Sequence, residues 1–363
     1  MDEEADNPVT PLPLRNVGII YSTSDCSASG REIEKSADCE VIDVAHAIQA
    51  ALTQRGIRVE LVDLDPERIA DLQKFDYLFN LAETIFGFPL KDYEVAEKLE
   101  SLRINFTGAG SSSLKACVDK AFTKEELLKY GILTPAFELY QPGEPVHTHL
   151  NFPLIVKPVQ EDGSFGITAD SVVWDEAALQ TQVLNTHKLY LQGALVEEFI
   201  EGRDVTASIL GNGSEAVCLP LSEIVYPEDN EVKFLTFEAK WVVESPIFRS
   251  SIGHCPCQVE SEVQEEICRS ALQAYKIMNC RDYARVDFRI RGKEVFVLEV
   301  NPNPCLNPED SGYVRCGNAQ GYNYNDLVYQ ILVTSFNNRF SDPNSFSIGV
   351  AYDRYVENII KNR

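Results

Sequence analysis

Two β-rich runs joined by a short turn constrain the fold of this chain most. Residues 283–290 and 294–300 flank the tripeptide Arg291-Gly292-Lys293, and side chains alternate between two faces along a strand. Six even positions are apolar: Val286, Phe288, Ile290, Phe296, Leu298 and Val300. The odd positions include four polar side chains: Arg285, Asp287, Glu299 and Asn301. If the turn keeps an even register, these four side chains share one face of a hairpin and the apolar face packs into the core.

The polar face of this hairpin has the composition of a metal site. Asp287, Glu299 and Asn301 supply two carboxylates and an amide oxygen on neighbouring strands. Mg²⁺ prefers such hard oxygen ligands, together with phosphate oxygens. Arg285 beside them can neutralise a phosphate or a developing oxyanion. A half-exposed hairpin with a merely solvated polar face would show the same alternation, so the pattern alone favours neither interpretation.

Two further segments combine features that nucleotide sites use. Lys157 ends an apolar run and precedes a Gly/Ser loop at 161–166. Glycines let backbone amides approach phosphate oxygens, and a nearby lysine supplies charge. Residues 195–204 place an apolar strand end and several acids where they can meet an adenine edge and ribose hydroxyls. Each segment by itself also fits an ordinary turn.

Alternating strand and helix patterns in the first part of the chain indicate a small α/β domain. Apolar residues recur at helical spacing between Val41 and Leu52, and Gly56 favours a helix stop. Strands are predicted at 17–21, 57–62 and 77–81, and a short helix at 93–102. This order predicts a domain that ends near residue 110.

The rest of the chain mixes helices and strands without an internal repeat. Helices are predicted at 119–131, 175–184 and 261–276. Strands are predicted at 152–158, 193–199, 204–210 and 216–221. The last residues, 341–363, read as a loop followed by a helix.

Charge and cysteine content narrow the class of protein. The 363 residues contain 56 acidic and 32 basic side chains, a formal net charge of −24. This charge argues against nucleic acid or an anionic membrane surface as a main partner, although a few lysines can still bind a nucleotide. No apolar run approaches the roughly 20 residues that span a bilayer. Ten scattered cysteines and an acidic N-terminus without a signal-peptide pattern favour a cytoplasmic protein.

Four segments, taken in order, resemble the ATP-grasp superfamily and, within it, the D-alanine–D-alanine ligase family. The resemblance covers residues 17–340. The segments are Val156-Lys157-Pro158 with Gly163-Ser164-x-Gly166, Glu197-Glu198-Phe199-Ile200-x-Gly202-x-Asp204, Ala284-Arg285-Val286-Asp287-Phe288, and Leu298-Glu299-Val300-Asn301-Pro302-x-Pro304. No single segment is specific, but the four in this order are.

The resemblance implies an α/β (α+β) chain with the ATP-grasp fold. A flexible acidic N-terminus, 1–15, would precede an N-terminal parallel-sheet domain, 16–110, that binds substrate. Two mixed α+β subdomains would follow: a central ATP-grasp subdomain, 111–203, and a C-terminal ATP-grasp subdomain with the metal site, 204–340. A tail, 341–363, would end the chain in a helix.

The resemblance also assigns roles to residues of the nucleotide site. Lys120 and Lys157 would contact ATP phosphates or the adenine region. The adenine hinge would be Glu197, Glu198 and Ile200, with Asp204 on the ribose. The loop residues Gly163 and Ser164, together with Lys240, would reach the phosphates. Two Mg²⁺ ions, or Mn²⁺, would bind Asp287, Glu299 and Asn301. Arg285, Lys240 and Ser164 would be catalytic, with Arg285 stabilising the tetrahedral intermediate.

The segments that would bind the substrates depart from the family pattern. Asp38 stands where a substrate-binding Glu is expected, and Glu83 lies in a segment that replaces the family's His-Gly. Cys305 and Leu306 replace the usual Gly-Met, and Trp241 replaces a Tyr after Lys240. Asp38, Glu83 and Cys305 are therefore candidate substrate residues. Cys305 is either a nucleophile beside the metal site or a small residue that fits the turn.

The implied reaction is ATP-dependent ligation of a carboxylate to an amine through an acyl phosphate, with release of ADP and phosphate. Because the segments expected to bind substrate differ from the family pattern, we expect a specialised ligase for peptide or amino-acid natural products. Its substrates would be amino acids or peptides. We also expect a homodimer. Three alternatives stay open. They are a ligase that activates a carbonyl, as in the synthesis of mycosporine-like amino acids, a genuine D-alanine–D-alanine ligase, and an ATP-binding regulatory protein without turnover.

Overall fold

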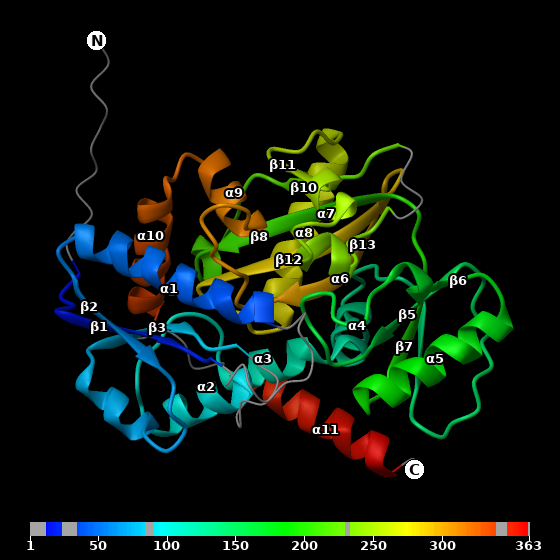
Figure 1. The fold of residues 1–363 in the computed structure, drawn as a ribbon, viewed down its shortest axis with the longest axis horizontal. Helices are drawn as coiled ribbons and strands as arrows, with labels where there is room; N and C mark the ends of the chain where they lie inside the picture. Colours follow the sequence, from blue (N-terminus) through cyan, green and yellow to red (C-terminus); the bar gives the residue numbers. More distant parts are fainter. Residues whose placement is uncertain (1–11, 24–34, 84–90, 229–232, 339–346, 362–363) are drawn as a thin grey trace.

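The computed structural model describes residues 12–23, 35–83, 91–228, 233–338 and 347–361, with the side chains of 35–40 and 347 left aside. Strands in this part of the chain form three separate sheets. Figure 1 shows the three sheets side by side, with helices packed against them. None of the helices in these ranges is both long and apolar enough to cross a membrane.

The first sheet is the parallel sheet expected at the N-terminus. Its strands β1 and β3 match the predicted runs, and a helix follows β1 because buried apolar residues recur along one of its faces. Gly56 adopts a φ of +78° just after this helix, a conformation that glycine adopts without strain. The elements are β1 (Asn16–Tyr21), α1 (Lys35–Gln54), β2 (Arg58–Asp63), η1 (Ile69–Lys74), β3 (Tyr77–Leu81) and α2 (Asp92–Ser101), with the strand order β2-β1-β3.

The second sheet belongs to the central part of the chain and is antiparallel. One helix, α5, covers it and encloses a core of Leu179 and Val183 against the strands. This helix continues past the predicted end at 184, and Leu191 stops it in a left-handed conformation with a φ of 54°. The elements are β4 (Phe137–Tyr140), β5 (Leu154–Pro158), η2 (Ala169–Ser171), β6 (Val172–Val173), α5 (Glu176–Tyr190) and β7 (Ala194–Glu198), in the order β4-β7-β5-β6.

The third and largest sheet contains the predicted hairpin. Two helices, α4 and α8, pack under one face of it and form the main core. The strand predicted at 216–221 is present only as the two-residue β9. The elements are α4 (Lys120–Lys129), β8 (Arg203–Leu210), η3 (Gly213–Glu215), β9 (Val217–Cys218), β10 (Ser222–Val225), β11 (Ile252–His254), α8 (Ser261–Ile277), β12 (Tyr283–Arg291) and β13 (Glu294–Asn301), in the order β11-β10-β8-β12-β13 with β9 on β8.

The hairpin β12–β13 keeps its predicted polar face but also carries a bulge. Two pairs of the polar face stand opposite each other: Arg285 with Asn301, and Asp287 with Glu299. The register then shifts, because Phe288 pairs with Val297 and leaves Leu298 as an extra residue.

This bulge corrects the predicted apolar face of β13. Val295 and Val297, not Phe296 and Leu298, pack into the core with the even residues of β12. Leu298 instead faces the cavity described below. The prediction for positions 296 and 298 is wrong because one extra residue shifts the alternation of all residues on its far side.

In the described residues, four further helices and two short ones pack between and around the sheets. Helix α10 packs on α1, so the end of the chain helps to cover the first sheet (Figure 1). The helix expected at the C-terminus is present as α11, which packs on α3 and brings Tyr352 onto Phe122 with a ring separation of 5.0 Å. The bounds are α3 (Ser111–Val118), α6 (Phe237–Trp241), α7 (Pro246–Ser250), α9 (Gly312–Ala319), α10 (Tyr324–Asn338) and α11 (Ser347–Lys361).

Candidate active site

A cavity of about 460 Å³ lies between the second and third sheets. Its walls include β5 and β7 on one side and β8, β10, β12 and β13 on the other. Most of the predicted site residues line it: Lys120, Lys157, Gly163, Ser164, Glu197, Glu198, Ile200, Asp204, Lys240, Arg285, Asp287, Glu299 and Cys305. The structure therefore brings together residues that are up to 185 positions apart, from Lys120 to Cys305.

The polar face of the hairpin forms one hydrogen-bonded group at the cavity wall. Arg285 donates from Nε and Nη2 to the two carboxylate oxygens of Asp287, at 2.7 and 2.8 Å. Asn301 donates from Nδ2 to Asp287 Oδ2 at 2.9 Å and to Glu299 Oε1 at 3.5 Å. Asn301 thus joins the predicted group through its contacts, although it does not itself appear in the cavity wall.

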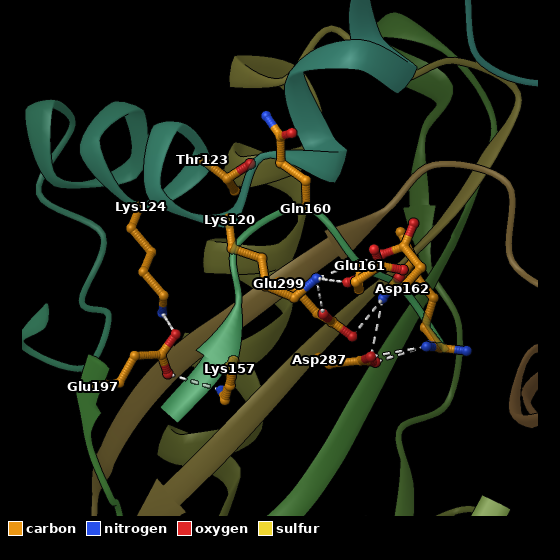
Figure 2. A network of polar contacts seen from close by, with 12 residues as sticks. Lys120, Thr123, Lys124, Lys157, Gln160, Glu161, Asp162, Glu197, Asp287 and Glu299 are labelled. Atoms are coloured by element: carbon orange, nitrogen blue, oxygen red, sulfur yellow. Dashed lines mark hydrogen bonds and ion pairs between the residues drawn. The ribbon is translucent and has the colours of Figure 1, made fainter. Parts of the chain in front are cut away.

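Lys120 links this group to the Gly/Ser loop. The ammonium lies 3.4 Å from Glu299 Oε2 and 3.6 Å from Asp162 Oδ1, and it donates to the backbone carbonyl of Glu161. Figure 2 shows Lys120 reaching from α4 to a position between the loop and Glu299. A single buried ammonium therefore ties the loop after β5 to the carboxylate of β13.

Burial and neighbouring charges act in opposite directions on these groups. Burial favours the neutral form of Glu299, but Lys120 and Arg285 outweigh it and hold the pKa of Glu299 below its usual value. Burial likewise works against the charge on Lys120, yet Glu299 and Asp162 raise its pKa. For Asp287, burial outweighs Arg285 and raises the pKa. The wall thus holds a charged Glu299 and Lys120 next to Asp287, whose negative charge is disfavoured by burial and stabilised by Arg285.

Glu197 is held between two lysines at the opposite wall. Its Oε2 accepts from Lys157 at 2.8 Å, and its Oε1 lies 3.2 Å from the ammonium of Lys124 (Figure 2). Glu197 and Lys124 are almost completely buried, at 1% and 0% exposed. Burial would raise the pKa of Glu197, but the two lysines lower it. The carboxylate is therefore charged, and it orients Lys157 in the cavity wall.

Asp204 at the start of β8 is also fixed by neighbours. Arg289 approaches its Oδ1 at 2.8 Å, and Tyr226 donates to its Oδ2 at 2.6 Å. Arg289 also donates to the backbone carbonyls of Gly202 and Lys233, at 3.2 and 2.7 Å. Arg289 thereby connects the segment between the two sheets to the loop that follows β10.

The Gly/Ser loop lies against the segment around α6. Gly163 and Ser164 both adopt positive φ, at 62° and 64°. Trp241 Nε1 donates to the backbone carbonyl of Gly163 at 2.7 Å, and Lys240 lines the same part of the cavity. The Gly/Ser loop and helix α6, which the sequence associates only by resemblance, are therefore in direct contact.

A second, smaller cavity of about 50 Å³ lies between the first and third sheets. Glu83 and Cys305 both line it, together with Trp241, and Cys305 and Trp241 also line the large cavity. Glu83 is exposed to solvent, and its backbone pairs with Ser22. The third candidate substrate residue, Asp38, lies in α1, but its side chain falls outside the described residues.

The sequence interpretation missed two charged residues of the large site. Lys124 follows Lys120 by four positions, so both lie on one face of α4, and this spacing was a signal that could have found it. Arg289 occupies an odd position of β12, the same face as Arg285 and Asp287. Their role depends on partners from other strands, Glu197 and Asp204, which the sequence does not pair with them.

The polar face fits a divalent cation by the chemistry of its donors. In the described part of the chain no three His, Cys, Asp or Glu side chains gather at one point. Mg²⁺, however, commonly takes only one or two carboxylates from protein, completed by phosphates and water. Asp287 and Glu299 each lie beside a positive side chain here, Arg285 and Lys120. A half-turn of the Asn301 amide would present its oxygen to the same point.

The fold and this cavity define a class of protein: an ATP-grasp ligase, with a large cavity between two antiparallel sheets. The sequence model of a family described as "D-ala D-ala ligase C-terminus" matches residues 131–333. This match covers more than half of the chain, so the chain belongs to the D-alanine–D-alanine ligase family of ATP-dependent ligases that form C–N bonds.

Individual relatives agree with this family. An uncharacterized protein of Sinorhizobium fredii is 33% identical over 80% of this chain and 86% of its own length. A D-alanine–D-alanine ligase of Polaromonas sp. is 32% identical over 78% of this chain and 82% of its own. The crystal structure of a D-alanine–D-alanine ligase from Bacillus anthracis in complex with ATP superposes with a TM-score of 0.72 at 23% identity, covering 90% of this chain and 99% of that one. The expected ATP-grasp fold is confirmed.

Proposed function

We propose that this ligase joins the amine of one amino acid or peptide to the carboxylate of another substrate in specialised peptide or amino-acid synthesis. The observation that supports this proposal most is the contrast between the residues that line the two cavities. The residues expected to bind ATP meet in the large cavity, whereas the smaller cavity is lined by residues that depart from the family pattern, Glu83 and Cys305. An unchanged nucleotide side with a changed substrate side supports the same chemistry on other substrates.

The proposed nucleotide contacts follow from the charges in the large cavity. Lys120, Lys157 and Lys240 face the triphosphate, and the loop at Gly163 and Ser164 covers it. The strand end at Glu197, Glu198 and Ile200 offers backbone groups to the adenine, and Asp204 accepts from the ribose hydroxyls. With these contacts the γ-phosphate would point toward the hairpin, where Lys120 lies 3.4 Å from Glu299.

The proposed reaction has two steps. A carboxylate oxygen of the first substrate attacks the γ-phosphorus, the bond to the bridging oxygen breaks and ADP leaves. The amine then attacks the acyl carbon, phosphate leaves and the nitrogen loses a proton. Arg285 stabilises the negative oxygen that develops on the acyl carbon. Asp287, Glu299 and Asn301 would hold two Mg²⁺ ions, or Mn²⁺, which neutralise charge on the phosphates.

Neighbouring elements exclude water from this site. The contact between Trp241 and Gly163 keeps the Gly/Ser loop against the segment of α6. A covered acyl phosphate reacts with the amine instead of with water. The family's other expected properties, a homodimer, a cytoplasmic location, and no binding of nucleic acid or membrane, stay predictions.

A substrate panel tests the proposal. Purified protein is incubated with Mg·ATP and pairs of amino acids, dipeptides and other carboxylic acids, with D-alanine as a reference pair. ADP release and product mass are then measured. We expect ADP release and a new C–N bond with a pair other than two D-alanines. A product formed only from two D-alanines makes the protein a D-alanine–D-alanine ligase, whereas a phosphorylated carbonyl product supports the mycosporine-type alternative. Binding of Mg·ATP without ADP release on the whole panel contradicts the proposal.

A further inference from the structure

The large cavity extends from the polar face of the hairpin, the candidate metal site, to Arg315. Four residues form one row on this face of the sheet, because each pairs with the next across strands β13, β12, β8 and β10: Glu299, Asp287, Thr206 and Ser222. Arg315 stands at the end of this row, with Nη1 3.4 Å from Ser222 Oγ. Two strand spacings, about 10 Å, separate Ser222 from Asp287. A substrate that reacts near Asp287 can therefore extend along the row toward Arg315.

The guanidinium of Arg315 is positioned by its surroundings. Arg315 reaches from α9, and its Nη2 donates to the backbone carbonyl of Asp310 at 3.0 Å. Gly253 of β11 provides the space, because a Cβ atom at this position would lie 1.5 Å from Arg315 Nη1. The glycine therefore leaves a place in the wall that the guanidinium occupies.

The charge of Arg315 is unlike that of the other arginines in the cavity wall. Arg285 and Arg289 each form an ion pair with a carboxylate, at 2.7 and 2.8 Å. In the ranges that the structure describes, Arg315 has only a carbonyl and a hydroxyl as partners. The hydroxyl of the neighbouring Ser311 is already used, since it donates to the carbonyl of Cys305 at 2.5 Å and caps α9.

The floor between the two ends also has an unused polar atom. Thr206 Oγ1 is buried and has no hydrogen-bond partner among the described residues. It lies in the row between Asp287 and Ser222. A buried hydroxyl without a partner is costly unless a ligand or water completes it, so polar atoms of a substrate fit this part of the cavity.

We propose that Arg315 binds a free carboxylate of the amine-donating substrate. This substrate is then an amino acid, or a peptide with a free C-terminal carboxylate. It is not a simple amine or a carboxamide. The inference rests on the proposed ligase function. The amine points toward the acyl phosphate, and the carboxylate of the same molecule points toward α9.

The test compares a substrate with its amide. Once the panel has identified an amine substrate, kinetics are measured with the free acid and with the corresponding carboxamide, for wild type and Arg315→Met. We expect Arg315→Met to raise the KM for the acid by about 10- to 100-fold, the effect of one charge-assisted hydrogen bond. The KM for the amide and the KM for ATP should change less than about threefold.

Two variants separate recognition from folding. Arg315→Lys keeps the charge and should recover part of the preference for the acid. Gly253→Ala keeps the arginine but displaces its guanidinium, so it should weaken the acid preference in the same direction. Arg269→Met, on the exposed face of α8, is the matched control and should behave as wild type.

The outcomes are distinct. An equal ratio of acid to amide activity in wild type and Arg315→Met overturns the role of Arg315 while the ligase function stands. The role of Arg315 is also overturned if an amine without a carboxylate is turned over as well as an amino acid. Absence of ADP release with every pair on the panel removes the proposed function and this inference together.

Discussion

Each buried charged residue of the site has an oppositely charged partner, which limits the substitutions that the protein tolerates. Arg285 with Asp287 and Lys157 with Glu197 are ion pairs in largely buried positions. Removing one partner from such a pair leaves the other charge buried and uncompensated, which is more costly than removing both. Substitutions that keep shape but remove charge therefore report on chemistry, provided that folding is measured alongside activity.

Glu299 is the residue at which the metal assignment is tested most directly. Glu299→Gln keeps the side-chain volume but removes the negative charge that faces Lys120, 3.4 Å away. We expect turnover to fall by about 100-fold or more while the protein stays folded, because Lys120 keeps Asp162 and the carbonyl of Glu161 as partners. ADP release at saturating Mg·ATP and circular dichroism check the two parts. Glu294→Gln, at the turn end of the same hairpin, is the control, and near-normal activity of Glu299→Gln would contradict the metal role.

The buried Lys124 should make the free energy of unfolding depend on pH. Burial lowers its pKa to about 8, from an ordinary 10.5, despite the attraction of Glu197. Below about pH 8 the folded protein bears the cost of a buried ammonium, and above about pH 10.5 the lysine is neutral in both states. Between these values the unfolded chain binds more protons, so the contribution of Lys124 to stability rises with pH.

The measurement for Lys124 is a difference between two proteins. Urea unfolding of wild type and Lys124→Met at pH 7.5 and 9.5 gives the free energy of unfolding of each. Other titrating groups cancel in the difference to first order. The free energy of unfolding of wild type minus that of the variant should increase from pH 7.5 to pH 9.5. A constant difference would show that Lys124 does not titrate in this range.

At the scale of secondary structure, the contact between α6 and the Gly/Ser loop carries a prediction about coupling. Trp241→Phe removes the N–H that donates to Gly163 at 2.7 Å but keeps an aromatic ring beside Phe237. A loop held less firmly leaves the acyl phosphate more open to water. We expect more than one ADP released per product formed, with the KM for ATP little changed.

Trp174 offers a matched control for this variant. It is the other of the two tryptophans in the chain, and it is 65% exposed on the central subdomain. Trp174→Phe should keep tight coupling of ADP release to product, and its remaining tryptophan then reports nucleotide binding by fluorescence. A Trp241→Phe protein with one ADP per product would argue that the contact does not exclude water.

The hairpin shows how far sequence alternation reaches as a predictor. It placed Arg285, Asp287, Glu299 and Asn301 on one face, because pairing next to the polar residues follows the simple alternation. It failed at Leu298, since the run 294–300 contains no glycine or proline that would mark an extra position. A bulge is decided by pairing with the partner strand, which a single strand's pattern does not contain.

The helices at the edges of the site were harder to predict. Helix α3 begins at a Gly-Ser-rich segment that looks like a loop, although its serines lie in the first turn of a helix. Helix α9 places Arg315 in the cavity, but only the contact with Gly253 of β11 reveals this role. Such roles depend on which distant elements meet, and spacing along the chain carries no information about that.

At the scale of the whole molecule, Asp282 joins the first and third sheets. It is 1% exposed, and its carboxylate accepts from Gly108 N at 2.8 Å and from Asn212 Nδ2 at 3.0 Å. Asp282→Ala removes both contacts at a position with a φ of 68°. We expect a loss of about 2–4 kcal/mol in the free energy of unfolding, because two buried donors lose their acceptor.

Chemical denaturation checks this value, with two comparisons. Asp282→Asn keeps one acceptor and tolerates the left-handed backbone, so it should lose less. Asp326→Ala removes the exposed ion pair of α10 with Arg55, the residue after α1, which is another link between the N-terminal and later parts of the chain. Exposed pairs contribute up to about 1 kcal/mol, so a loss from Asp282→Ala no larger than that from Asp326→Ala would contradict the buried link.

The packing of α10 on the first sheet has a consequence for synthesis on the ribosome. The core of the N-terminal domain combines Ile19 and Ile48 with Leu327 and Leu332 of α10, so it lacks one wall until nearly the whole chain has emerged. The core of the central subdomain, by contrast, comes entirely from residues 140–196. The middle of the protein can therefore fold while the beginning waits for the end, and the nascent N-terminal domain is the part that exposes apolar surface longest.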